Sequence, residues 1–513
     1  MRCVVVRRFS VAAVCLLLVA AATCCDAVEI ELVGRIDASL AKAGRFLVAG
    51  QSPDGAWRSE TYGAFRDGPT LTPYVMSCLF YLPQAEPDAP AAYRRGVDYL
   101  AGFVDHDGRL DVGPRELLFP VYTAASASRV VVLQESGPRN EQAQEAWLAY
   151  LLRRQLNEAL GWSRSDPEYG GWGFSLGVPE KPRPGELKER FFESNLAATI
   201  FGLAALRSAK VSQDDPAYRQ ALVFVRRCQN FSADPSRSDS RFDDGGFFFM
   251  PEDPVQNKAG IAGVDRFGRR RFHSYGTMTA DGLRALLRAG LAPEHPRVVT
   301  ARAWLESNFS AEHNPGTFEP DRAVLQDATY YYWAWAVAHA FLAVRTRRIE
   351  MTEGQVDWAE ELAEALISRQ QADGSWINRY TDAREDDPLV ATPWAAASLA
   401  ICRSTLTGKR ETLSSQPSPP AGLSRSDSTG TSADGHRDRR EHGARRNGDL
   451  QRAVSSQSTV TRHPAVTPGR GRLLGGMVLY GHSQLGRNQR GLWSGETSSH
   501  GRMHDEPNVF DGR

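Results

Sequence analysis

The sequence of 513 residues lacks a surplus of charge of either sign. Its 61 Lys and Arg balance its 61 Asp and Glu, so the formal net charge is zero. The whole chain therefore offers no electrostatic argument for a nucleic-acid partner, and we predict none. Hydrophobic residues make up 42% of the chain, which supplies enough apolar material for a large core and argues against a wholly disordered or fibrous protein.

Cysteine is scarce in the body of the chain. Of the seven cysteines, only Cys78, Cys228 and Cys402 lie beyond the first 27 residues. Three dispersed cysteines in apolar, helical contexts do not make a disulfide framework, so we expect small buried side chains. The six histidines after residue 408 have no metal-site spacing. We predict neither a metal nor a cofactor.

The N-terminus lacks an apolar run long enough for a membrane-spanning helix, which needs about 20 residues. Arg2, Arg7 and Arg8 precede an apolar run from Val11 to Ala22, and small residues follow it. This order is typical of a signal peptide, so we predict that residues 1–27 direct export and that the protein is secreted or periplasmic. An uncleaved signal anchor is the alternative, and only in that case do we expect a membrane contact.

A recurring turn is the main feature that the sequence does contain. Gln51-Ser-Pro-Asp-Gly-Ala-Trp57 is followed by Thr72-Pro73 and an apolar run, and Gln370-Gln-Ala-Asp-Gly-Ser-Trp376 is followed by Thr392-Pro393 and another. Looser glycine turns lie near residues 107–108, 170–174, 244–247 and 316–318. An amphipathic stretch precedes each turn and a uniformly apolar stretch follows it. We therefore predict about six units, each an outer helix, a glycine turn and an inner helix.

The turn residues have clear structural roles. The glycine of Asp-Gly tolerates a positive φ, so the chain can reverse after the outer helix, and the tryptophan can wedge between units. Threonine before proline is expected to begin the inner helix with a capping hydroxyl. Six helix pairs can close into a ring with a central cavity, which we assign to residues 28–407. Residues 408–513, rich in Ser, Thr, Gly, Pro and Arg, are predicted to be a low-complexity, disordered tail.

Two of these turns resemble the QW motif of the prenyltransferase and squalene-cyclase repeat family. The residues that carry the motif are Gln51, Gly55, Trp57, Gln370, Gly374 and Trp376. The resemblance covers about residues 36–402 and implies an all-α (α/α)6 toroid, terpenoid cyclase or prenyltransferase-like, whose apolar cavity holds isoprenoid chains. Residues 275–280 also resemble a segment of uncharacterised exported bacterial members. The layout is similar to polysaccharide lyases and complement thioester domains too, so the fold alone does not fix the function.

The catalytic residues of the best-studied relatives are missing. Squalene-type cyclases use a D-x-D-D acid, and the nearest stretches here, Asp105-His-Asp107 and Glu385-Asp-Asp387, are interpreted as solvated turn acids. Protein prenyltransferases need a zinc site of Asp, Cys and His, but Asp-x-Cys is absent and no His neighbours the body cysteines. Whether the protein is an enzyme is left open.

Polar and aromatic residues at the starts of three inner helices are the candidates for a site. Histidine and tyrosine can exchange protons in a shielded site, which makes such positions candidates for catalysis. The catalytic candidates are His273, Tyr275, Asp327 and Glu193. The candidates for ligand binding, with helix packing as their alternative role, are Tyr330, Tyr331, Trp333, Trp335 and His339.

Three functions remain open at this point. An exported toroid that binds or transforms an isoprenoid-like hydrophobic molecule predicts an aromatic cavity with few charges. A carbohydrate-active lyase or hydrolase predicts an open cleft with Asp, Glu, His and Tyr at one rim. A noncatalytic protein-binding scaffold predicts a ring plugged by side chains. The oligomeric state is not determined by the sequence.

Overall fold

The computed structural model describes residues 29–408 except 83–84, 114–116, 187–191 and 353. The predicted signal peptide and tail lie outside the described residues. The described part is mostly helical, which confirms the main part of the predicted fold class. Three short antiparallel strand pairs are additions that the sequence pattern did not indicate.

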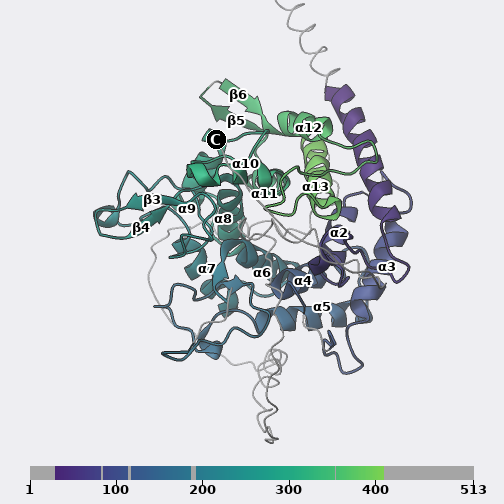
Figure 1. The fold of residues 1–513 in the computed structure, drawn as a ribbon, viewed down its shortest axis with the longest axis horizontal. Helices are drawn as coiled ribbons and strands as arrows, with labels where there is room; N and C mark the ends of the chain where they lie inside the picture. Colours follow the sequence, from purple (N-terminus) through teal and green to yellow (C-terminus); the bar gives the residue numbers. More distant parts are fainter. Residues whose placement is uncertain (1–28, 83–84, 114–116, 187–191, 353, 409–513) are drawn as a thin grey trace, which may run out of the picture. The chain divides into compact units, whose positions relative to one another are not determined.

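The helices fall into an inner and an outer set (Figure 1). The inner helices are α2 (Thr72–Leu79), α4 (Pro120–Val130), α6 (Leu196–Ser208), α8 (Gly276–Arg288), α11 (Tyr330–Val344) and α13 (Pro388–Thr407). The outer helices are the one over residues 29–49, α3 (Ala89–Ala101), α5 (Pro138–Leu152), α7 (Pro216–Arg227), α9 (Pro296–Ser307) and α12 (Trp358–Ser368), and the short α10 (Val324–Ala328) precedes α11.

The strands form two-residue to four-residue ribbons in the loops between helices. The pairs are β1 (Trp172–Gly173) with β2 (Ser194–Asn195), β3 (Ile261–Val264) with β4 (Arg270–Phe272), and β5 (Arg348–Met351) with β6 (Gly354–Asp357). Trp172 lies opposite Asn195 in the first pair, and Arg348 lies opposite Asp357 in the third. These ribbons lengthen the turns of the middle and last units without joining into a larger sheet.

The inner helices contact one another in a closed order. The contacts run from α2 to α4, α6, α8, α11 and α13, and α13 returns to α2. Outer helices α3, α5, α7, α9 and α12 pack on α2, α4, α6, α8 and α13 respectively. Five of the six inner helices are therefore covered by an outer helix on one side, and α11 packs between α8 and α13, which explains why the inner sequences are uniformly apolar.

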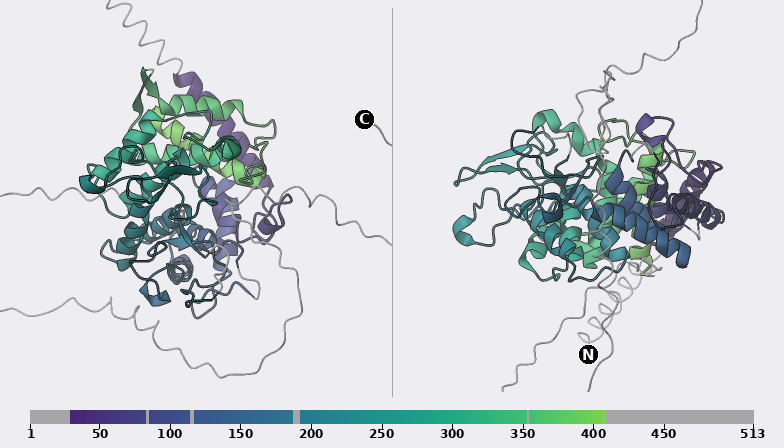
Figure 2. Two further views of the ribbon diagram at one scale, coloured as in Figure 1. Left: turned by 60° about the vertical axis from the view of Figure 1, so that its left-hand side comes forward. Right: turned by 90° about the horizontal axis from the view of Figure 1, so that it is seen from below.

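The ring closes where the first described helix meets the last two helices (Figure 2). Ser39 donates its hydroxyl to Gln370 Oε1 at 2.8 Å, and Arg35 forms a bidentate ion pair with Glu364 at 2.7 and 2.6 Å. Exposed ion pairs contribute little stability, about 0–1 kcal/mol. Closure therefore depends mainly on the buried apolar face of residues 29–49, formed by Leu32, Ile36, Leu40, Ala43 and Leu47.

Tryptophan joins the outer and inner helix of a unit. Trp57 donates its indole N–H to Leu47 O at 2.7 Å and its backbone N–H to Thr72 Oγ1 at 3.0 Å. Trp376 makes the same two bonds, to Leu366 O at 2.8 Å and Thr392 Oγ1 at 3.0 Å. Both indoles are fully buried, so each ties the end of an outer helix to the inner helix that follows.

The expected capping role of the threonines is wrong in detail. α13 begins at Pro388 and is capped by Asp387, whose carboxylate accepts the Leu389 N–H at 2.9 Å, so Thr392-Pro393 lies inside the helix. The N-cap of α2 is Leu71, which has no capping side chain. The threonine hydroxyls are used instead by the tryptophan N–H groups, which are buried and need an acceptor.

The glycine and glutamine of the turn behave alike in different units. Gly55 and Gly374 have φ of +92° and +93°, as predicted, and a Cβ at either would collide with a carbonyl oxygen of the neighbouring helix. Four glutamines donate to the carbonyl of the turn glycine: Gln51, Gln155, Gln229 and Gln370, at 2.8–3.0 Å. The bonds of Gln155 and Gln229 span 15 and 16 residues instead of four. These two glutamines therefore do not match the Gln-x3-Gly spacing that identifies the motif in the sequence.

Apolar burial agrees with the sequence in two further respects. Cys78, Cys228 and Cys402 are free and buried, as predicted. Helix α13 is long and apolar enough to cross a membrane by length and composition, but 89% of its most apolar stretch is buried inside the protein. Its contacts with α2, α11 and α12 account for this burial, as expected for a core helix.

Candidate functional site

The inner helices enclose a space that we call the chamber. Its walls come from α2, α4, α6, α11 and α13, and the lining residues used below are Tyr74, Tyr122, Ser126, Arg129, Phe201, Tyr332, Trp335, His339 and Trp394. It contains two cavities of about 40 and 30 Å³, which share four wall residues. Each has room for one or a few waters. The large apolar cavity implied by the family resemblance is not open in this structure, because aromatic side chains fill it.

The aromatic lining is organised around Trp335. Its indole stacks on Tyr332, with ring centroids 5.7 Å apart, and on Phe201, with centroids 5.9 Å apart. Tyr332, Trp335 and His339 follow one another at helical spacing on α11, so all three face inward. On the facing wall, the Tyr74 ring meets Trp394 edge-on at 5.4 Å. This surface offers π faces to an apolar or cationic group.

A buried carboxyl group lies within this ring of helices. Asp281, on α8, has a fully buried side chain that pairs with Arg284 Nη1 at 3.1 Å and accepts the Tyr332 hydroxyl. Burial raises the pKa of Asp281 to about 6, although Arg284 and Tyr332 oppose this rise. Sequence reasoning missed Asp281. The signal available was a charged pair three residues apart in an otherwise buried, apolar helix.

Three arginines gather at the end of the chamber where the inner helices finish. Arg129 lies in the last turn of α4, and Arg284 and Arg288 lie one turn apart on α8. Arg284 stacks over the Trp335 ring at 4.4 Å. Within the described residues, Arg129 and Arg288 form no hydrogen bond or ion pair. Burial lowers the pKa of Arg288, and the charges of Arg284 and Arg129 lower it further.

The arginines also affect a neighbouring histidine. His339 is buried, and its Nδ1 lies 2.9 Å from Trp335 O, which assigns the proton to Nδ1. Burial, and then the charge of Arg284, lower the pKa of His339 well below its usual value, so the ring is neutral at pH 7. Among the described residues, Asp281 is the one acid that forms an ion pair with this cluster of three arginines.

Several buried polar groups on the inner helices, or directly before one, form no hydrogen bond with any described residue. They are Tyr122 Oη, Tyr275 Oη, Arg284 Nε and Trp394 Nε1. Burial raises the pKa of both tyrosines well above 10, and the charge of Asp281 adds to the rise. Buried donors without partners are rare in folded proteins, because each loses its bonds to water. Tyr122 and Trp394 line the chamber, so their hydroxyl and indole N–H can bond a molecule inside it.

Two of the five residues predicted to bind a ligand line the chamber, namely Trp335 and His339. The other three donate hydrogen bonds away from it. Tyr330 Oη donates to Ala311 O at 2.8 Å, Tyr331 Oη donates to Ile377 O at 3.2 Å, and Trp333 Nε1 donates to Ser310 O at 2.8 Å. The packing role set out as their alternative is therefore the one that their contacts show.

The four predicted catalytic residues do not meet in one site. His273 is half-buried in a surface pocket beside Asp244, and burial lowers its pKa. Tyr275 is fully buried as the residue before α8. The remaining two are peripheral: Asp327 is half-exposed, 3.9 Å from Arg379, and Glu193 is half-buried directly before β2. Glu193 precedes α6, His273 and Tyr275 precede α8, and Asp327 lies in α10 before α11.

The second acidic stretch corrects the sequence interpretation, whereas the first agrees with it. Asp107 is exposed in its turn. Glu385 and Asp387 are buried rather than solvated. Glu385 accepts the backbone N–H groups of Tyr331 and Tyr332, both at 2.9 Å, and burial raises its pKa to about 8. Their burial is compensated because they accept N–H groups that have no partner within the helix. Glu385 does so at the start of α11 and Asp387 at the start of α13.

Comparisons with known proteins give structural likeness only. No family model and no curated protein matches the chain. A variant of the type II terpene cyclase MstE from Scytonema, in complex with its substrate geranylgeranyl dihydroxybenzoate, is 13% identical, with 73% of this chain and 99% of that chain covered and a TM-score of 0.45. An unsaturated glucuronyl hydrolase specific for heparin is 12% identical, with 74% and 98% covered and a TM-score of 0.43. A protein from Actinoplanes is 16% identical, with 72% and 99% covered and a TM-score of 0.41.

Metal chemistry finds no support in the described ranges. They contain no group of three or more His, Cys, Asp or Glu side chains arranged to hold a metal ion.

Proposed function

We propose that this protein is an exported (α/α)6 toroid of terpenoid cyclase type that binds an apolar, isoprenoid-like molecule with an anionic end group in its chamber. The observation that carries the proposal is the pairing of an aromatic wall with three clustered arginines. The rings of Phe201, Trp335 and Trp394 suit an apolar chain, and the arginines suit a carboxylate or phosphate. Export is proposed from the predicted signal peptide at residues 1–27.

The same observation argues against a purely structural plug. A plug that only stabilises the ring is best made of apolar side chains, because a buried charge without a partner costs several kcal/mol. Here Arg129 and Arg288 are half-buried, and their side chains form no hydrogen bond or ion pair with a described residue, while the buried hydroxyl of Tyr122 forms no hydrogen bond. An anionic ligand would supply the missing ion-pair partner of these arginines and so offset the cost of their unpaired charges.

Ligand binding must displace side chains, because the two cavities are small. They share Tyr74, Ser126, Phe201 and Trp394 as walls, so movement of one shared side chain joins them. Trp394 is the best suited, since its indole N–H forms no hydrogen bond that would hold it. Mass spectrometry of lipids that co-purify with the exported protein tests the proposal directly. Recovery of a stoichiometric anionic isoprenoid supports it, and a protein that carries none and takes up none contradicts it.

The arginine cluster gives a sharper prediction. We expect the double variant Arg129→Gln and Arg288→Gln to bind farnesyl diphosphate at least tenfold more weakly than the wild type, because the diphosphate loses two charge-assisted partners. Binding of farnesol, which has no anionic group, should change less than twofold. Without ligand the double variant should be at least as stable as the wild type, because two like charges are removed. Calorimetric titration and thermal unfolding measure both effects.

Arg207→Gln is the matched control, because Arg207 lies in the last turn of α6 but is not a lining residue of the chamber. It removes the same charge from the same helix position, so it accounts for the favourable effect of a basic residue at a helix C-terminus. Equal losses in farnesyl diphosphate affinity for the control and the double variant would overturn the role assigned to Arg129 and Arg288.

A second candidate function is proton-initiated transformation of the ligand. Asp281 favours it, because its pKa of about 6 keeps a fraction of the carboxyl group protonated near neutral pH inside an aromatic wall. Aromatic faces can also stabilise a positive charge that develops on the ligand.

A further inference from the structure

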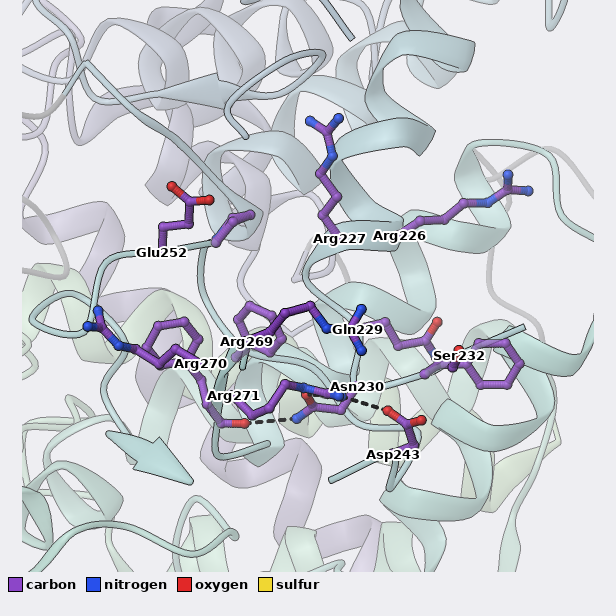
Figure 3. Close-up of a pocket in the computed structure, with 14 residues that line it drawn as sticks. Arg226, Arg227, Gln229, Asn230, Ser232, Asp243, Glu252, Arg269, Arg270 and Arg271 are labelled. Atoms are coloured by element: carbon purple, nitrogen blue, oxygen red, sulfur yellow. Dashed lines mark hydrogen bonds and ion pairs between the residues drawn. The ribbon is translucent and has the colours of Figure 1, made fainter. Parts of the chain in front are cut away.

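A second, larger hollow lies outside the chamber. We call it the arginine pocket; it has a volume of about 670 Å³, within the usual range of ligand sites. Figure 3 shows Arg226 and Arg227, from the end of α7, on one side and Arg269, Arg270 and Arg271, from the β3–β4 hairpin, on the other. Two acids, Asp243 and Glu252, also line it.

Some of these arginines are held by ion pairs within the protein, and others are free to bind a ligand. Arg271 is held by Asp243 at 2.6 Å, and Arg269 by Asp265 at 2.8 Å, which positions the hairpin side of the pocket. Arg226 and Arg270 are exposed and form no ion pair or side-chain hydrogen bond within the described part of the chain. Glu252 is also exposed and forms no ion pair there, so the available side chains carry two positive charges, one from each side of the hollow, against one negative charge.

A polar pocket of about 500 Å³ adjoins the arginine pocket. Consecutive residues line the two: Asp243 and Phe272 the first, Asp244 and His273 the second. Asn230 connects them, because it accepts from Arg271 Nη2 at 3.2 Å and donates to Ser274 Oγ at 2.9 Å. The network is continuous from the arginines to the polar pocket.

The polar pocket offers one carboxylate, Asp244, and several neutral hydrogen-bonding groups, and neither Lys nor Arg is among its described lining residues. Asp244 accepts from Ser274 Oγ at 2.8 Å and from Trp304 Nε1 at 3.2 Å, which orients its carboxylate. The further lining groups include Thr300 and Asn308. Each carboxylate oxygen has two lone pairs, so Asp244 can still accept from a ligand hydroxyl. Such a set suits a molecule with several hydroxyl groups.

We infer that the two adjoining pockets bind an acidic oligosaccharide. Its carboxylate or sulfate groups would lie against Arg226 and Arg270, which bind planar or tetrahedral anions through paired N–H groups. Its hydroxyl groups would lie in the polar pocket beside Asp244. A neutral sugar leaves the arginines without partners. A nucleic acid would bring its continuous phosphate backbone against Asp243, Asp244 and Glu252, which repel it.

The test uses the full chain at 150 mM salt and a heparin-derived hexasaccharide, with maltohexaose as a neutral probe of equal length. We expect the wild type to bind the acidic probe at least tenfold more tightly than the neutral one. The double variant Arg226→Gln and Arg270→Gln should lose at least tenfold in affinity for the acidic probe. It should fold normally, because neither side chain has an internal partner.

Arg94→Gln is the control, since Arg94 is an exposed arginine on α3, outside both pockets. The inference is overturned if this control weakens binding as much as the double variant, or if the two hexasaccharides bind equally. Tighter binding of a single-stranded DNA of matched charge would also overturn it in favour of a nucleic-acid site. The site is separate from the chamber, so these outcomes do not depend on the proposed isoprenoid function.

Discussion

Replacing Trp376 with alanine is expected to destabilise the protein by about 3–5 kcal/mol, the usual range for a buried tryptophan. The indole is fully buried between an outer and an inner helix, and its N–H bonds Leu366 O at the end of α12. Alanine would leave a large cavity at the seam where the ring closes, and a helix carbonyl without its donor. Because whole proteins are stable by only about 5–15 kcal/mol, the loss should be visible as a large drop in the urea midpoint.

Trp376→Phe separates the two contributions. Phenylalanine retains most of the packing but cannot donate to Leu366 O, so we expect a loss of about 1–3 kcal/mol. Trp57→Ala should resemble Trp376→Ala, because Trp57 makes equivalent bonds to Leu47 and Thr72. A cost below about 1 kcal/mol for Trp376→Ala would contradict the role assigned to the tryptophan turn.

Asp281 is the second position with a large expected effect. Asp281→Ala removes the ion-pair partner of Arg284, which is only 3% exposed, and should destabilise the protein by about 3–5 kcal/mol. Asp281→Asn retains an acceptor for Tyr332 or Arg284 and should cost less. Chemical unfolding monitored by circular dichroism at pH 7 measures both variants, and equal costs would contradict the unpaired charge as the cause.

The raised pKa of Asp281 adds a pH dependence with a definite sign. An unfolded aspartate has a pKa of about 3.9, whereas the folded value is about 6. Between these values the folded state keeps a proton that the unfolded state has lost. The free energy of unfolding therefore falls as pH rises from about 4 to 6, by roughly 3 kcal/mol. The difference between the wild type and Asp281→Asn isolates this slope from that of other titrating groups, and an unchanged slope would contradict it.

The same variant tests the second candidate function. If Asp281 donates a proton to the bound molecule, Asp281→Asn should bind farnesyl diphosphate normally but form no product from it or from a longer polyprenyl diphosphate. Mass spectrometry of the reaction mixture measures this. Equal product from the wild type and the variant would exclude Asp281 as the acid, and binding by the arginine cluster would stand unaffected.

Each of the three functions predicted from the sequence agrees with the structure in one feature and differs from it in another. An apolar cavity with few charges was expected for an isoprenoid site, but the chamber combines aromatic rings with Arg129 in its wall and Arg284 stacked on Trp335, and it is largely filled. The open cleft expected for carbohydrate chemistry has a counterpart in the surface pockets, where His273 and Asp244 lie together. The plugged ring expected of a scaffold matches the small cavities, but the buried Asp281 and Arg284 and the half-buried Arg129 and Arg288 argue against an apolar plug.

Local patterns determined much of the architecture. The order of outer and inner helices, the positive φ of Gly55 and Gly374 and the burial of Trp57 and Trp376 follow from helical periodicity and turn chemistry. Such features depend on residues that are neighbours in the chain, so the sequence contains them directly.

The site depended on contacts between units far apart in the chain. Asp281 meets Tyr332 across 51 residues, and the charge of Arg129 on α4 affects the arginines of α8 only because the inner helices close into a ring. In two of the middle units, the motif glutamines Gln155 and Gln229 could not be recognised from the sequence. Inserted residues changed the spacing between glutamine and glycine but not the hydrogen bond between them. The sequence alone therefore determined the helix pairs and their turns. Tertiary structure decided which side chains face the chamber and which acids are buried, because burial depends on what the rest of the chain brings to the same place.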